Sequence, residues 1–468
     1  MCFMLYNSLY ASPNSISNCV QRCSSLNMRG NLLLLYPDEL RGGGIFPESR
    51  VQKPYIMLIL QLLVKHILIL TEIDMTNILP RSSSRIPEID RLRGLVMVLM
   101  ALDHMRDFLD ADALRFNPTD LCHTYPILFF TRLVTHLCAP TFAFLAGCGA
   151  FLYGDRIKNS RALSQFLISR GFWLIALDIF LVGPVFAGGP GKAELGTLWA
   201  IGCGLVALSA LCRLRAEQVL IIGLVIVFGH DILDGVHASD LGVYGPWWRL
   251  LHERGDLPLG VPGSVVYPIL PWIGVVALGY GFGQIFLRPE PVREGIIRVS
   301  GYCALLIFVV LRTINSYGDP VHWTIQNDKL STFLSFLNVS KYPPSLLYLM
   351  LTLGISALIM GPLTRMRAGI NKQAGDALAV FGRTPLLFYI LHLYLGAAAG
   401  LIVAHFQGYS FQQISEFIQS KSVPEDLGLG LIGAYVGWIA VVLLLYPVCR
   451  QFDRFKQRRS DLWILRYL

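Results

Sequence analysis

The stretch RIPEIDRLRGLVMVLMALDHMRDFLD, residues 85–110, decides the fold. A charged lead-in ends at Gly94, and an apolar run follows that stops in a dense group of polar residues after Leu102. Leu92 to Leu109 is about long enough to cross a bilayer as a helix, at roughly 1.5 Å per residue. Because ionisable side chains inside a membrane span are costly, those that this span carries are candidates for function.

Arg93 and His104 share one face of this predicted helix. They are eleven residues apart in the sequence, which is about three turns and roughly 16 Å along the axis. Met97 and Met100 fall on the same face between them. One stripe therefore connects a guanidinium near one membrane surface with an imidazole near the other. The alternative is that His104 is only a polar residue at the end of a span, where it meets water.

The composition of the whole chain is that of a polytopic membrane protein. Of its 468 residues, 54% are hydrophobic and 15% are charged, against about 25% charged residues in ordinary soluble domains. The net charge of +8 is explained by basic loops on one side of the membrane, so we predict no nucleic-acid partner. The cysteines lie mostly in or beside apolar runs without CxxC spacing, which argues against disulfides and zinc sites.

From residue 92 onward, the apolar runs predict an all-α fold with about ten membrane-spanning helices. The predicted spans are residues 92–109, 127–153, 170–187, 196–212, 217–234, 265–287, 297–316, 344–362, 378–404 and 428–448. Alternate loops are rich in Lys and Arg, and the loops between them are poor in both. By the positive-inside rule the basic loops are cytoplasmic, so both ends of the ten-span unit lie inside. Arg93 is then near the cytoplasmic surface and His104 near the outer one.

Residues 1–84 differ from the ten-span unit at 85–468, and we predict that they are an atypical N-terminal extension. The apolar run at 55–71 is interrupted by charged residues and is marginal as a span. It lacks a small-residue cleavage site, which argues against a signal peptide. Met75 begins a sequence typical of a cytosolic start. Our hypothesis is that translation begins there.

Further polar residues are predicted near the outer ends of the first two spans. Asp120 and His123 lie in the loop between these spans, and Arg132 and His136 share a face of the second span at i, i+4. Because consecutive helices usually touch, we expect these residues close to His104. The alternative for His136 is a hydrogen bond between helices.

The residue types in this group indicate acid–base chemistry. A histidine oriented by a carboxylate acts as a general base, and an arginine holds a carboxylate, a phosphate or a developing oxyanion. Two tryptophans in an outer loop form either a platform for a sugar or part of the interfacial aromatic belt. The catalytic candidates are His104, His123, His136 and Asp103. The substrate-binding candidates are Asp120, Arg132, Trp247 and Trp248.

Other reaction classes have weaker support. A zinc site made of His104, His123 and His136 lacks HxxxH or HExxH spacing, so it ranks below the acid–base interpretation. The sequence has no Walker loop, no GxGxxG after a strand and no GxSxG elbow. ATP-driven pumping and serine hydrolase chemistry are therefore not indicated.

Six segments resemble bacterial membrane proteins related to the catalytic domain of heparan-α-glucosaminide N-acetyltransferase. They are IDRLRGLVMVLMALDHMRDF (89–108), FFTRLVTHLCAPTFAFLAG (129–147), YPILPWIGVVALGYGFG (267–283), KYPPSLLYLMLTLG (341–354), FGRTPLLFYILHLYL (381–395) and ILRYL (464–468). The resemblance extends over about residues 85–468. It implies a transmembrane acyltransferase of the bacterial inner membrane, which takes an acetyl group from cytosolic acetyl-CoA and passes it to a sugar amine or hydroxyl on the outer face.

The resemblance also implies roles for individual residues. The spacing from Arg93 to His104 is similar to the pattern of Arg, ten residues and His in the wider family of membrane sugar O-acyltransferases, where the histidine is the candidate base. In the lysosomal enzyme an asparagine takes the place of His104, and the essential histidine lies in the following outer loop, where His123 is the nearest match. We expect His104 to be the base, and no metal. The residues expected to bind acetyl-CoA are Arg91, Arg93, Arg383, Tyr389 and His392.

A transporter or flippase for a small anion or a lipid-linked sugar is the competing hypothesis, because the same charged residues would line its path. A structural membrane protein without turnover would leave the buried charges unexplained. The resemblance and the absence of an obvious inverted repeat favour the acyltransferase. The expected partners are the lipid bilayer and a glycan or amino-sugar acceptor, and a homodimer is compatible with the sequence.

Overall fold

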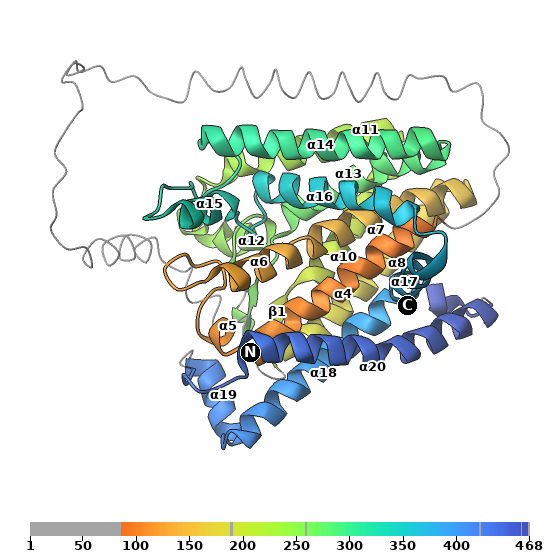
Figure 1. Ribbon diagram of the computed structural model, residues 1–468. Coiled ribbons are helices and arrows are strands. Elements are labelled where there is room, and N and C mark those ends of the chain that lie inside the picture. The colour runs from red at the N-terminus through yellow and green to blue at the C-terminus, as the bar shows by residue number, and fades with distance from the viewer. Residues whose placement is uncertain (1–85, 188–190, 258–259, 421–422, 460, 467–468) are drawn as a thin grey trace, which may run out of the picture. The chain divides into compact units, whose positions relative to one another are not determined.

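The computed structural model describes residues 86–187, 191–257, 260–420, 423–459 and 461–466 (Figure 1). The predicted N-terminal extension and the predicted start at Met75 lie outside these residues. The described part is built almost entirely of helices, and many of them are long and apolar. This confirms the predicted class, an all-α polytopic membrane protein.

Eight helices in the described part of the chain are long and apolar enough to cross a membrane. They are α6 with α7 (Pro126–Thr135 and Cys138–Ile157), α8 with the π-helix η2 and α9 (Ser160–Leu177, Asp178–Val182 and Gly183–Phe186), α11 with η3 (Ala216–Gly229 and His230–Leu233), α13 with η6 (Ile269–Phe282 and Gly283–Leu287), α14 (Glu290–Ile314), α16 (Leu346–Thr364), α18 (Pro385–Phe406) and α20 (Gly430–Arg458). The other two predicted spans are also helices. One is α4 (Pro87–Leu109), which carries many ionisable residues, and the other is α10 (Thr197–Leu211), which has 15 residues.

Shorter elements connect these helices. They are α5 (Ala111–Arg115), η4 (Ala238–Tyr244), α12 (Gly245–Leu251), α15 (Lys329–Leu337), α17 (Gly369–Arg383), α19 (Phe411–Ser420), η7 (Trp463–Arg466) and the strands β1 (Ala193–Leu195), β2 (Gly255–Asp256) and β3 (Gly263–Val265). The strands form a small sheet in the order β1-β3-β2. In it β1 is parallel to β3, with Ala193 opposite Gly263, and β2 is antiparallel to β3. This sheet was not predicted from the sequence.

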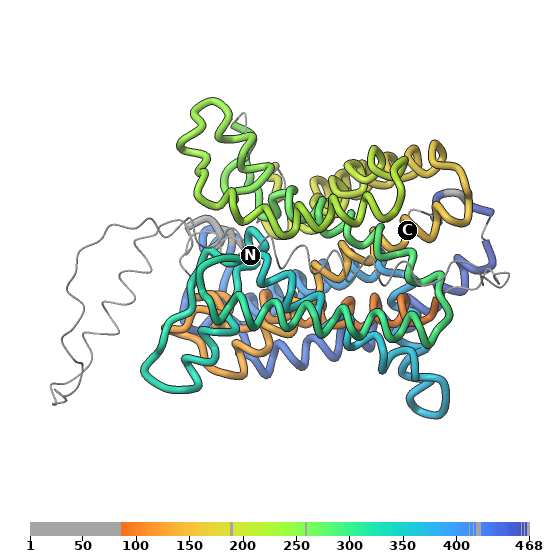
Figure 2. Tube along the Cα trace, turned by 90° about the horizontal axis from the view of Figure 1, so that it is seen from above, coloured from red at the N-terminus to blue at the C-terminus, as the bar shows by residue number. Residues whose placement is uncertain are grey.

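Helix α4 runs through the middle of the helical unit (Figure 1). It contacts α6, α7, α16, α17, α18 and α20, and most of its residues are buried, including charged ones. Helices α11 and α14 overlap in Figure 1, but Figure 2 shows that they lie apart in depth. Helices α14 and α20 are the least buried of the eight apolar helices. On α20 the exposed Ile432, Val436, Ile439 and Leu443 follow one face, which is the kind of surface that faces lipid.

Two prolines explain where predicted spans are interrupted. Pro140 has no N–H to donate to the carbonyl of His136, four residues earlier, and the chain breaks there between α6 and α7. The hydroxyl of Tyr348 on α16 donates to this carbonyl at 2.9 Å, so the acceptor is satisfied from another helix. Pro385 separates α17 from α18 in the same way. The predicted ninth span, residues 378–404, is therefore two helices.

Ion pairs connect the helix ends that we predict to be cytoplasmic. Glu88 at the start of α4 pairs with Arg293 at the start of α14. Glu294 of α14 pairs with Arg365, which directly follows α16, at 2.6 Å. These three helix ends therefore lie on one side of the unit, as an alternating up-and-down path requires. The assignment of this side to the cytoplasm stays a prediction.

Glycines allow α4 and α17 to come into close contact. A Cβ atom at Gly94 would lie 1.8 Å from the carbonyl oxygen of Leu378, and one at Gly382 would lie 1.8 Å from that of Asp90. We therefore expect Gly94→Ala to lower the stability by roughly 1–3 kcal/mol or more, because over-packing forces the two backbones apart. The measurement is the melting temperature of the purified protein in detergent.

Gly149→Ala is the matched control for this prediction. Gly149 lies on α7, and a Cβ there would meet no atom within 4 Å. We expect the melting temperature of this variant to stay equal or to rise slightly, because alanine favours a helix over glycine by about 1 kcal/mol. A Gly94→Ala variant that melts together with this control would contradict the close contact of α4 with α17.

Candidate functional site

The carboxylate of Asp103 on α4 is the centre of a buried polar cluster. Its Oδ1 accepts hydrogen bonds from Nη1 of Arg132 at 2.7 Å and from Oγ1 of Thr135 at 2.5 Å. Arg106 places Nη2 2.7 Å from the same oxygen and 2.6 Å from Oδ1 of Asp107. All five residues are buried. Charge-assisted bonds of this kind offset the cost of removing charges from water.

Local spacing explains why these groups converge. Asp103 and Arg106 are three residues apart on α4, as are Arg132 and Thr135 on α6, so each pair occupies one face of its helix. Helix α4 packs against α6, which brings the two faces together. The structure thus places Arg132 directly beside Asp103.

His104 and His392 form a hydrogen-bonded pair inside the helical unit. Nδ1 of His104 lies 2.8 Å from Nε2 of His392, and Nδ1 of His392 lies 2.8 Å from the carbonyl oxygen of Phe388. A carbonyl only accepts, so Nδ1 of a neutral His392 carries its proton, and its Nε2 is an acceptor. Nδ1 of a neutral His104 must then donate to that acceptor. The lone pair of His104 is therefore on Nε2, which is ready to act as a base.

Aromatic rings surround His104. The ring of Phe186 on α9 lies 5.3 Å from the imidazole, centroid to centroid, and that of Tyr389 on α18 lies 6.2 Å from it. Tyr389 also lies 5.7 Å from the ring of His392, in an edge-to-face arrangement. Tyr389 and His392 were predicted to contact the donor, and the structure places both beside the predicted base.

His136 lies at the break between α6 and α7. It is buried, and its ring packs edge-on against Tyr348 with 5.5 Å between the ring centres. Nδ1 of this ring has no hydrogen-bond partner among the residues that the structure describes. The three histidines considered for zinc, including His104 and His123, have separate surroundings. Across the described ranges, no group of three or more His, Cys, Asp or Glu side chains is arranged to hold a metal ion.

The arginines predicted to bind the donor lie toward the other end of α4. Arg91 donates to a main-chain carbonyl of α16 at 2.8 Å. Arg93 donates to Asp90 at 3.2 Å and to a main-chain carbonyl of α17 at 3.1 Å. Arg383 binds Asp453 through Nε and Nη2. The side chains of Arg93 and Arg383 are each 24% exposed and accessible to a ligand, whereas Arg91 is buried.

Asp120 and His123 lie in a turn between α5 and α6. Nδ1 of His123 is 2.7 Å from Oδ2 of Asp120, and the imidazole is 62% exposed. Neither side chain has a hydrogen bond or ion pair with the described residues of the Asp103 cluster. Within the described residues, no polar contact of these two side chains joins the turn to the cluster, so their role in the site stays a prediction.

Trp247 and Trp248 lie on the short helix α12. Nε1 of Trp248 donates to the carbonyl of Val236 at 2.9 Å, so this indole is fixed within its own segment. Trp247 is 52% exposed. Trp247 is therefore the ring that is free to contact a sugar or the membrane interface.

Lys341 joins the Asp103 cluster, although the sequence did not single it out as a site residue. It precedes α16, is only 6% exposed and places Nζ 3.6 Å from Oδ2 of Asp103. The available signal was its location, because the predicted outer loops are poor in Lys and Arg. Arg106 was visible in the sequence as a polar residue after the apolar run, and its i, i+3 spacing from Asp103 predicts the contact that is found.

A protein-family model described as heparan-alpha-glucosaminide N-acetyltransferase, catalytic, matches residues 85–312. The match begins one residue before the described part of the chain and ends near the end of α14. It includes most of the Asp103 cluster and His104, but it stops before Lys341 and His392. No curated protein matches the chain significantly. Through residues 85–312, this chain is related to the family of heparan-alpha-glucosaminide N-acetyltransferase catalytic domains.

Proposed function

We propose that the protein is a transmembrane acetyltransferase of the bacterial inner membrane, which moves an acetyl group from cytosolic acetyl-CoA to a hydroxyl or amine of a sugar on the outer face. The family match supports acetyl transfer as the class of reaction. Eight apolar helices support a multi-pass membrane location. The observation that carries the proposal is the buried pair of His104 and His392, which leaves a lone pair on Nε2 of His104.

His104 is the general base of the proposed reaction. Nε2 takes the proton of the acceptor hydroxyl or amine while the acceptor oxygen or nitrogen attacks the carbonyl carbon of the thioester. The bond between this carbon and sulfur breaks, and the sulfur of CoA takes the proton from Nε2. The products are an acetyl ester or amide and free CoA. A positioned base of this kind contributes roughly 10²–10⁴-fold to the rate.

The arginines near the N-terminal end of α4 support entry of the donor from that side. The phosphates of acetyl-CoA are anionic, and the guanidinium groups of Arg93 and Arg383 are partly exposed there. His104 is roughly 16 Å further along the helix axis than Arg93. The pantetheine arm of the donor is long enough to bridge this distance.

The test of the proposal is acetyl transfer by the full chain, purified in lipid nanodiscs. Labelled acetyl-CoA is supplied together with glucosamine, which offers an amine, or with glucose, which offers only hydroxyls. Label in the sugar and an equal release of CoA thiol would support the proposal. No transfer to either sugar, together with saturable uptake of an anion or a lipid-linked sugar by proteoliposomes, would replace it with the transporter hypothesis.

His392 is a positioning residue in this scheme, and two substitutions separate its role from mere bulk. His392→Gln keeps an acceptor for the N–H of His104, whereas His392→Leu removes it. We expect kcat to fall roughly 10- to 100-fold in the leucine variant, which corresponds to about 1–3 kcal/mol for a buried donor left without a partner. The glutamine variant should retain most of the activity, and KM for acetyl-CoA should stay constant in both. Equal kcat values would mean that His104 does not depend on this acceptor.

A further inference from the structure

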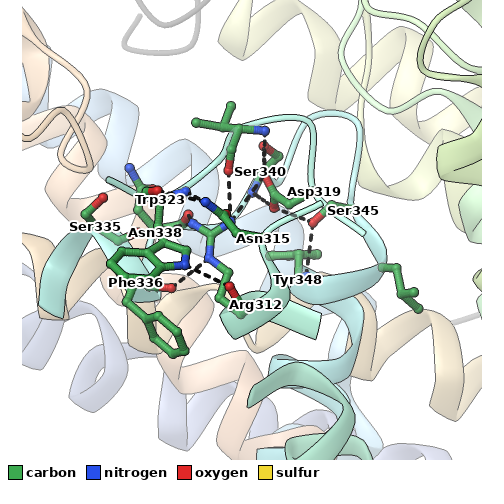
Figure 3. Close-up of polar contacts among 12 residues, drawn as sticks. Arg312, Asn315, Asp319, Trp323, Ser335, Phe336, Asn338, Ser340, Ser345 and Tyr348 are labelled. Carbon is green, nitrogen blue, oxygen red and sulfur yellow. Dashed lines mark hydrogen bonds and ion pairs between the residues drawn. The ribbon is translucent and has the colours of Figure 1, made fainter. Parts of the chain in front are cut away.

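A hydrogen-bond network holds the loop between α14 and α16 in place (Figure 3). Its centre is Arg312, near the end of α14, which is 1% exposed. Its guanidinium donates to four main-chain carbonyls of this loop, those of Val321, Ser335, Phe336 and Asn338. One buried side chain thus fixes both arms of the loop, with α15 between them.

Asp319 fixes the part of the loop that leads into α16. Its Oδ2 accepts from the N–H of Ser340 at 2.8 Å and from Oγ of Ser345 at 2.7 Å (Figure 3). Burial raises the pKa of Asp319, and the neighbouring Arg312 and these hydrogen bonds act in the opposite direction. Ser340 and Ser345 lie on either side of Lys341 in the sequence. The network therefore fixes the main chain from which the Lys341 side chain extends.

Lys341 is buried, and its ammonium group donates no hydrogen bond to a side chain or carbonyl of the residues that the structure describes. Its side chain is 5% exposed, and Nζ lies 3.6 Å from Oδ2 of Asp103, which is longer than a hydrogen bond. Nζ also lies over the ring of Tyr342, 5.2 Å from its centre. Asp103 already accepts from Arg132 and Thr135, so it only partly compensates the lysine. A buried charge with incomplete partners is costly, so a further group is expected to complete the site.

The donors of Arg106 also indicate that a further group completes the site. Its side chain is 0% exposed, and Nη2 is bound to Asp103 and Asp107. Nε and Nη1 have no hydrogen-bond partner among the residues that the structure describes. Guanidinium groups bind oxygen anions through several N–H groups at once. Two cations with unfilled donors therefore border the same carboxylate.

We propose that Lys341, together with Arg106, binds an anionic oxygen of the substrate beside Asp103, near the C-terminal end of α4. The chemistry is the same for two sources of this oxygen. One is a carboxylate on the acceptor. The other is the oxyanion that develops on the acetyl carbonyl, and this source rests on the proposed acetyl transfer. Preorganised donors at a developing oxyanion contribute about 10²–10³-fold to kcat.

Substitutions at Lys341 test this proposal. Lys341→Met removes the charge at similar length, and Lys341→Arg keeps it. Lys329→Met is the matched control, since Lys329 starts α15 in the same loop and is exposed. Ser345→Ala leaves the charge in place and removes the two hydrogen bonds of its hydroxyl, one donated to Asp319 and one accepted from the N–H of Tyr348 at the start of α16. Full chains in nanodiscs are used throughout.

Binding is measured as the shift in melting temperature with glucuronate, against glucose as the neutral sugar of similar size. If the anion is a carboxylate of the acceptor, glucuronate raises the melting temperature of the wild type and of Lys329→Met, since a ligand that binds the folded state stabilises it. Lys341→Met loses this shift, and Lys341→Arg retains part of it. If the anion is the acetyl oxyanion, kcat for transfer to glucosamine falls about 10²–10³-fold in Lys341→Met at constant KM.

The outcomes also separate this proposal from the proposed function. A wild type without a glucuronate shift, together with a Lys341→Met variant of unchanged kcat, would overturn the role of Lys341. If the protein transfers no acetyl group, the proposed function fails. The glucuronate shift then tests Lys341 by itself, and a wild type without this shift would overturn the role of Lys341. If Lys341→Met does not fold, Ser345→Ala takes its place. A glucuronate shift or a kcat several-fold lower than that of Lys329→Met would support the proposal. Equal values in the two variants would contradict it.

Discussion

Acetyl transfer is expected to fall by roughly 10²–10⁴-fold in His104→Ala, because the substitution removes the general base from the reaction. The acceptor hydroxyl or amine then has no group that takes its proton as it attacks the thioester. His104 binds no phosphate in the proposed arrangement, so the affinity for acetyl-CoA should stay near that of the wild type. The measurement is the initial rate with labelled acetyl-CoA and glucosamine, with donor binding determined separately by calorimetry.

His405→Ala is the matched control for this experiment. His405 lies on α18, as His392 does, but it is exposed near the end of the helix. We expect its rate to equal that of the wild type. His123→Ala is the informative alternative, because the resemblance leaves the outer-loop histidine open as the base. A rate lost in His123→Ala and kept in His104→Ala would move the chemistry to the exposed turn.

The helices were predictable because the apolar run that forms each helix can be recognised within its own segment of the sequence. The span predicted at 92–109 is α4, and its real start at Pro87 follows from the preference of proline for the first turn of a helix. The interruptions were harder to place. The break before Pro140 is compensated by the hydroxyl of Tyr348, more than 200 residues away in the sequence, at 2.9 Å. The three strands have only two or three residues each, which is too short for an alternating pattern.

Only part of the candidate site could be predicted, because the local sequence does not show which distant parts of the chain touch. Asp103 and Arg132 lie on consecutive helices, and helical spacing together with the contact of such helices brings them together. The partner of His104 is 288 residues away in the sequence, and the period of one helix does not say which distant helix it touches. Lys341 depends on a loop that is folded by buried hydrogen bonds. His123 is close to the cluster in sequence, but its side chain is exposed and pairs with Asp120, because closeness in sequence does not determine whether a turn folds inward.

Asp103→Asn is expected to destabilise the protein by roughly 3–5 kcal/mol, which is typical when one partner of a buried ion pair is removed. The carboxylate faces the cations of Arg106, Arg132 and Lys341, with N···O distances of 2.7, 2.7 and 3.6 Å. An asparagine keeps the size of the side chain and loses its charge, so the three cations repel one another with the carboxylate of Asp107, which binds Arg106, left beside them. The measurement is the melting temperature and the denaturant midpoint of the purified variant.

Two further variants make this result specific to charge. Asp120→Asn removes a half-buried carboxylate that pairs with the exposed His123 and accepts from the N–H of Cys122, and an ion pair open to water contributes only about 0–1 kcal/mol. Combining Asp103→Asn with Lys341→Met should recover part of the lost stability, because the cation with the fewest partners is removed together with the anion. A single Asp103→Asn variant as stable as Asp120→Asn would mean that groups other than this carboxylate neutralise the cluster. The double variant would then melt below the single one, because removing Lys341 would unbalance a cluster that is already neutral.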